Sequence, residues 1–141
     1  MSALVLAVAV ATASPSTSAE KVSVQSLGEA EARIRKFVQT GSLLLTQGDC
    51  LAVRIYTKSP YTHVAAVVMR NGRPFVYDSA NGHGTRCQPL KNYLTSQGPT
   101  QIHVFCPKRE FSEKRGQKME SWLDDQLLSL IHISEPTRPL D

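Results

Sequence analysis

The sequence is poor in cysteine, and its 141 residues contain no apolar run long enough for a membrane-spanning helix. The three cysteines, Cys50, Cys87 and Cys106, are too few for a disulfide framework, and no two of them have the CxxC spacing of a zinc site. The histidines also lack the spacing of metal ligands. We therefore expect no metal, no other cofactor and no stable transmembrane segment.

Aromatic residues are scarce as well, at 6% of the chain, and none alternates with basic residues. A net charge of +4 indicates a soluble basic surface or attraction to an anionic polymer such as cell-wall material. Without an aromatic-interleaved basic stretch, we expect no nucleic-acid partner. The length allows one domain at most.

The first 19 residues have the pattern of an export signal. Leu4–Ala11 is apolar, small residues follow it, and Ala11-Thr12-Ala13 fits a signal-peptidase cleavage site. We therefore predict an exported protein, periplasmic or associated with the cell envelope. The alternative is that this run is an N-terminal core strand.

The last 14 residues look foreign to the protein. Leu128–Arg138, LSLIHISEPTR, matches the translation of a transposase-type sequencing-library adapter over eleven residues in one frame. We interpret 128–141 as an artefactual tail and 20–127 as a C-terminally truncated domain. The alternative is that 127–133 is a genuine apolar segment.

Between these ends, the pattern predicts helices around a strand meander. Ser26 and Glu29 have the spacing of a capping box, and Asn71-Gly72 is a strong hairpin signal. Strands are predicted at 42–45, 50–56, 63–69, 75–79, 85–88 and 101–106, and helices at 27–39, from 89 onward and at 112–126. The fold class predicted is α+β with a mostly antiparallel sheet.

The hairpin register brings two chemically useful side chains together. With Asn71 and Gly72 as the loop residues, Ala65 opposes Asp78, and His63 becomes the diagonal neighbour of Asp78 on the same face. A carboxylate in this position can orient an imidazole for general-base catalysis. The alternative is a histidine at a strand end with satisfied hydrogen bonds and no chemical role.

Four short motifs resemble one enzyme family. Gly48-Asp49, Ser59–Val64, Asn71-Gly72 and Tyr77–Ala80, in this order, resemble the permuted papain-like amidases, which are circularly permuted relatives of the NlpC-type cell-wall peptidases. The match covers about 41–94 and, more loosely, the chain to 127. The resemblance implies a papain-like fold.

The resemblance also implies catalytic roles. His63 would be the general base and Asp78 the third member of a triad, with the nucleophilic cysteine on a later helix. No cysteine follows Cys106 in this chain. Cys50 opens an apolar run that is typical of a strand, Cys87 follows a glycine-rich loop, and Cys106 ends a strand as a small hydrophobe. None of them has the expected position.

The sequence therefore predicts an exported cysteine hydrolase that cleaves amide or ester bonds in cell-wall peptides or lipid-linked substrates, and we expect the chain as it stands to be inactive. One alternative is a non-catalytic binding module on the same fold. Another is that His63 and Asp78 form only a buried polar pair. An open cleft at the two side chains favours the first two interpretations, and full burial favours the third.

Overall fold

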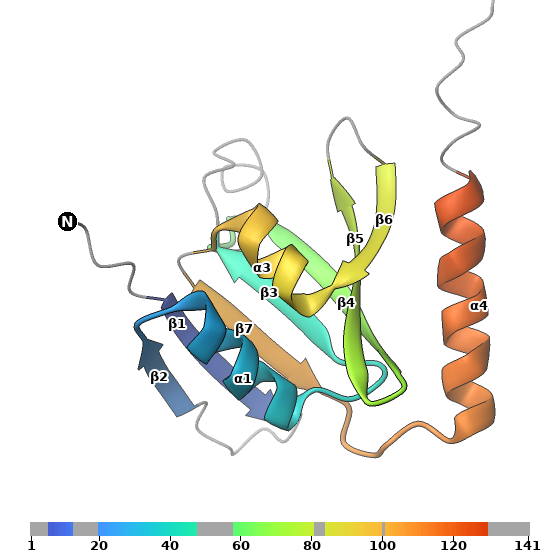
Figure 1. Cartoon of the computed structure of the whole chain (residues 1–141), viewed down its shortest axis with the longest axis horizontal. Coiled ribbons are helices and arrows are strands. Elements are labelled where there is room, and N and C mark those ends of the chain that lie inside the picture. The colour runs from blue at the N-terminus through green and yellow to red at the C-terminus, as the bar shows by residue number, and fades with distance from the viewer. Residues whose placement is uncertain (1–5, 13–19, 48–57, 81–83, 100, 130–141) are drawn as a thin grey trace, which may run out of the picture.

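One sheet organises the part of the chain that the computed structural model describes, which is residues 6–12, 20–47, 58–80, 84–99 and 101–129 (Figure 1). Its strands are β1 (Leu6–Thr12), β2 (Glu20–Val24), β3 (Leu43–Gln47), β4 (His63–Arg70), β5 (Arg73–Ala80), β6 (Gly84–Pro89) and β7 (Gln101–Cys106). The helices are α1 (Leu27–Phe37), α3 (Leu90–Gln97) and α4 (Glu113–Ser129). No helix in these ranges is long and apolar enough to cross a bilayer.

The strand order is β2-β1-β7-β3-β4-β5-β6. Every neighbouring pair is antiparallel except β1 and β7, which run parallel. Helices α1 and α3 lie together over one face of the sheet, whereas α4 stands beside β6 (Figure 1). The predicted α+β class with a mostly antiparallel sheet is confirmed.

The β4–β5 hairpin has the predicted register. Asn71 and Gly72 both have positive φ, at 50° and 72°, as the tight turn between right-twisted strands requires. Ala65 pairs with Asp78 across the two strands. The two-residue turn therefore fixes which β5 side chain faces which side of the sheet.

Helix α1 begins with the predicted cap. The Ser26 hydroxyl accepts a hydrogen bond from the Glu29 N–H (3.1 Å), and the Glu29 carboxylate accepts one from the Gln25 N–H (3.0 Å). The carboxylate thus reaches one residue further back than a standard capping box. The helix ends at Phe37, two residues before the predicted end, because Val38 is extended (φ −71°, ψ 142°).

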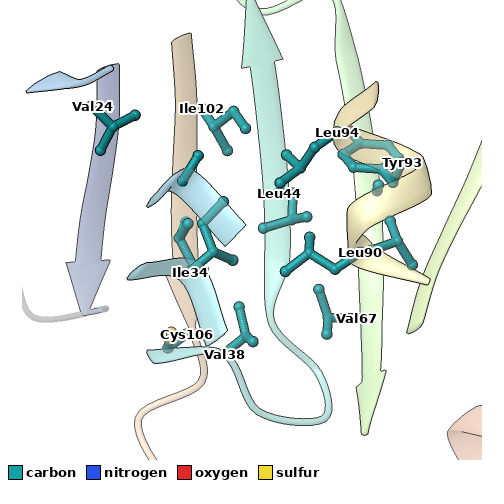
Figure 2. Packing of buried hydrophobic residues seen from close by; sticks show 14 residues of the cluster. Val24, Ile34, Val38, Leu44, Val67, Leu90, Tyr93, Leu94, Ile102 and Cys106 are labelled. Carbon is teal, nitrogen blue, oxygen red and sulfur yellow. The ribbon is translucent and has the colours of Figure 1, made fainter. Parts of the chain in front are cut away.

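The core lies between the sheet and the two helices α1 and α3. Alternate strand residues point into it, among them Leu44 on β3 and Val67 on β4, and both are fully buried. Ile34 of α1 and Tyr93 and Leu94 of α3 close over them (Figure 2). We call this side of the sheet the inner face.

The opposite side, the outer face, is covered in part by α4. Arg70 of β4 pairs with Glu120 and Asp124 of this helix, and Asp124 also accepts a hydrogen bond from the Tyr77 hydroxyl (2.5 Å). A cavity of about 460 Å³ lies between the outer face and α4. Three apolar side chains that line it are exposed, Leu43 (41%), Val64 (57%) and Trp122 (61%).

The expectation for the N-terminal run can be compared with the structure, whereas several other expectations fall on residues outside the described ranges. Residues 6–12, assigned above to an export signal, form β1 within the sheet, which is the arrangement that the alternative of an N-terminal strand predicts. Export itself stays a prediction. The predicted strand at 50–56, residues 81–83 of the glycine-rich loop and most of the tail lie outside the described residues.

Side chains along β3 alternate between the two faces of the sheet, which leads to a prediction about stability. Leu44→Ala should lower the free energy of unfolding by about 2–5 kcal/mol, because it leaves a cavity in the core on the inner face. The matched variant Leu43→Ala, one residue earlier on the outer face, should cost about 1 kcal/mol or less. Urea denaturation measures both, and equal losses would contradict the assignment of the two faces.

The attachment of α4 is also testable. Trp122 is the only tryptophan, so its fluorescence anisotropy reports the mobility of this helix. Arg70→Met should lower the anisotropy, since it removes the ion pairs to Glu120 and Asp124, and 1 M salt should lower it in the parent chain. The charge-matched control Arg73→Met should leave it unchanged. An unchanged value for Arg70→Met would show that other contacts hold the helix.

Candidate functional site

His63 and Asp78 meet at the inner face, where β4 begins and β5 nears its end. The His63 Nε2 atom lies 3.0 Å from Oδ2 of Asp78. The Asp78 side chain is fully buried and that of His63 is 20% exposed. The predicted contact between the two residues is confirmed, and their catalytic role stays a prediction.

The carboxylate has two further partners that the sequence analysis missed. Arg86 of β6 donates from Nε to Oδ1 and from Nη2 to Oδ2, both at 2.8 Å. Gln97, at the end of α3, donates to Oδ2 at 3.3 Å. Arg86 pairs with Asp78 in the β5–β6 register, which the sequence analysis did not assign.

The electrostatics keep Asp78 ionised. Burial alone raises the pKa of this carboxyl, but the hydrogen bonds from His63 and Arg86 and the charge of Arg86 outweigh burial and lower the pKa to about 2. An ionised carboxylate only accepts hydrogen bonds. The ring proton of neutral His63 therefore resides on Nε2, and Nδ1 keeps its lone pair.

The ring of His63 packs against α3 and keeps some exposure to solvent. Tyr93 of α3 stacks on it, with 6.3 Å between ring centroids and 27° between the planes. A small hollow of about 180 Å³ that includes His63 is also lined by Leu45 and Val64, which pair with each other and face the outer side of the sheet. The Asp78 carboxylate is thus shielded from solvent, whereas the His63 side chain is 20% exposed.

Neither described cysteine reaches this site. Cys87 pairs with Tyr77, one residue out of phase with Asp78, and its thiol faces Arg70 (3.7 Å) on the outer face. Burial raises the pKa of this thiol, which disfavours the nucleophilic thiolate. Cys106 lies at the far end of β7 and donates to the Phe37 carbonyl (3.2 Å).

Cys50, His83 and His132, and the Gly48-Asp49 motif, lie outside the described residues. His103 on β7 has polar partners of its own. Its Nδ1 is 3.0 Å from the Tyr61 hydroxyl and its Nε2 is 2.6 Å from Gln101. The described ranges contain no group of three His, Cys, Asp or Glu side chains that could hold a metal ion.

No protein-family model and no curated protein matches the chain. Among solved structures, it is similar to the crystal structure of the metalloprotein yiiX from Escherichia coli O157:H7, which carries the designation DUF1105. The TM-score is 0.53 and the sequence identity 23%, over 73% of this chain and 53% of yiiX. The chain therefore spans about half the length of yiiX, and the likeness concerns the fold.

The low pKa of Asp78 makes a prediction about acid stability. The ordinary value is 3.8 and the folded value about 2, so the ionised carboxylate stabilises the fold fully above about pH 5 and loses this effect as the pH falls toward 2. Asp78→Asn should therefore have a lower free energy of unfolding than the parent at pH 6. The difference between the two free energies, called the gap below, should narrow between pH 4 and pH 2.

Urea denaturation at pH 6, 4 and 3 measures this gap. Asp125→Asn, which changes an exposed carboxylate of α4, serves as the control and should follow the parent at each pH. A gap for Asp78→Asn that stays constant down to pH 3 would contradict the buried, ionised carboxylate.

Proposed function

We propose that this chain carries the base and the orienting carboxylate of an exported cysteine hydrolase with a permuted papain-like fold. The observation that carries the proposal is the His63–Asp78 contact, in which a buried ionised carboxylate leaves Nδ1 of a partly exposed imidazole available as a base. The motif resemblance supplies the reaction class. The fold shared with yiiX is compatible with it and says nothing of the chemistry.

The nucleophile in this proposal is a cysteine on a segment that follows α4, as the resemblance implies. Its thiol proton would pass to Nδ1 of His63 while the sulfur bonds to the carbonyl carbon of an amide or ester. The protonated ring would then give the proton to the departing amine or alcohol. Water would hydrolyse the acyl-enzyme and restore the thiol.

One feature of the site supports this proposal over a purely structural polar pair. The full burial of Asp78 fits either account, but the His63 side chain keeps 20% exposure, which a base needs in order to reach a substrate. Cell-wall peptides or lipid-linked amides and esters are the proposed substrates. The motif resemblance implies no metal or other cofactor, and the proposed steps use none.

The test is to read the source gene beyond the codon for Leu127, express the longer protein and assay hydrolysis of amide and ester substrates. We expect a downstream cysteine, and His63→Gln should lower kcat/KM by about 10²–10⁴-fold, because proton transfer contributes that much. The matched variant is His103→Gln, at the other described histidine, which contacts Tyr61 and Gln101. This variant should keep the activity of the parent.

The chain as it stands should show no thiol-dependent turnover, with or without Cys87→Ser. Turnover that Cys87→Ser abolishes would contradict the assignment of the nucleophile to a later segment. A longer gene with no downstream cysteine would leave a binding module on this fold as the better account.

A further inference from the structure

Arg86 is the one described cation that contacts the buried carboxylate, and the proposed reaction gives it no role. It comes from β6, the last strand of the sheet, and its guanidinium reaches across to Asp78 with two hydrogen bonds of 2.8 Å. The Arg86 side chain is 29% exposed and that of Asp78 is not exposed, so Arg86 lies between the carboxylate and solvent on one side. A two-pronged contact of this kind fixes both the position and the plane of a carboxylate.

We propose that Arg86 is a positioning residue that sets how Asp78 faces His63 and how readily the imidazole becomes protonated. The inference rests on the proposed function in so far as that imidazole is the base. It has two physical parts, one geometric and one electrostatic, and they can be separated by different substitutions.

The geometric part follows from how the oxygens of Asp78 are shared. Oδ1 receives Nε of Arg86, and Oδ2 receives Nη2 of Arg86 as well as Nε2 of His63. Because the fork of Arg86 fixes both oxygens, the carboxylate cannot rotate Oδ2 away from the ring. Arg86 thereby selects the ring tautomer that leaves Nδ1 unprotonated.

The electrostatic part follows from the charges around the ring. The groups that face His63 or Asp78 from the surrounding described elements are Arg86 on β6, Tyr93 and Gln97 on α3, and the neutral Thr46 on β3, which pairs with His63. Burial raises the pKa of Tyr93, so its hydroxyl stays neutral. Arg86 is therefore the charge that balances Asp78, and its removal would leave the charge of the carboxylate unopposed beside the imidazole.

The test is an NMR titration of the His63 ring in this chain, which needs no turnover. Arg86→Met should raise the midpoint of the titration by roughly one pH unit, because the charge of Asp78 would then favour imidazolium without opposition. Arg86→Lys keeps the charge and loses the fork, so its midpoint should stay near that of the parent. In the same variant, the share of the Nδ1–H tautomer should rise.

The matched control is Arg73→Met, which removes an equal charge at the turn end of β5 and should leave both readouts unchanged. A folded Arg86→Met chain with the parent midpoint would overturn the electrostatic part. Should that variant fail to fold, Arg86→Lys decides the matter, since a tautomer ratio equal to that of the parent would overturn the geometric part.

The outcomes separate this inference from the proposed function. A longer gene without a cysteine would overturn the hydrolase and leave the titration result standing. An active longer enzyme whose Arg86→Met variant has the parent pH profile would overturn the role of Arg86 and leave the hydrolase standing. If both the hydrolase and the role of Arg86 hold, the pH profile of activity of the Arg86→Met variant should move to higher pH by the same amount as the midpoint of its ring titration. Its activity at alkaline pH should persist.

Discussion

The buried carboxylate of Asp78 is the group on which the candidate site depends. Its side chain has no exposure to solvent, yet it stays ionised, since three donors converge on it from β4, β6 and α3. Such a charge is stable in a protein interior only when its hydrogen bonds are satisfied. Consequently, the same contacts that keep Asp78 charged also join one hairpin, the edge strand and a helix at one point.

The sheet separates this site from the other reactive groups in the described residues. Asp78 and Tyr77 are adjacent in sequence but point to opposite faces, and each takes its neighbours from that face. The inner face holds the imidazole and its carboxylate. The outer face holds the Arg70 cluster, the Cys87 thiol and the apolar cavity under α4. In the proposed reaction, a nucleophile would therefore approach the His63 ring from the inner side.

Local signals in the sequence predicted the parts of the site that a single turn controls. Asn71-Gly72 fixes a two-residue loop, so counting outward from it places Asp78 beside His63. The same reasoning did not lead to Arg86, because counting from Asn81-Gly82 as a two-residue loop would place Thr85 opposite Asp78, one residue away from the observed partner. Gln97 was beyond prediction for a different reason, since its position depends on how α3 packs over the sheet.

The N-terminal run shows the limit of composition as evidence. Leu6–Thr12 is apolar and is followed by small residues, a pattern shared by export signals and buried strands. Its parallel pairing with β7 joins segments about ninety residues apart, which no local pattern reveals. The capping box of α1, in contrast, depends on neighbours in sequence and was predicted almost to the residue.

The most direct test of this account is the ¹⁵N NMR spectrum of the His63 ring in the intact chain near pH 8. The account predicts one dominant neutral tautomer, with the proton on Nε2 and a bare Nδ1, because ionised Asp78 accepts only from Nε2. A ring protonated on Nδ1, or one that averages between the two tautomers as in a free peptide, would contradict the claim that Asp78 prepares His63 to act as a base.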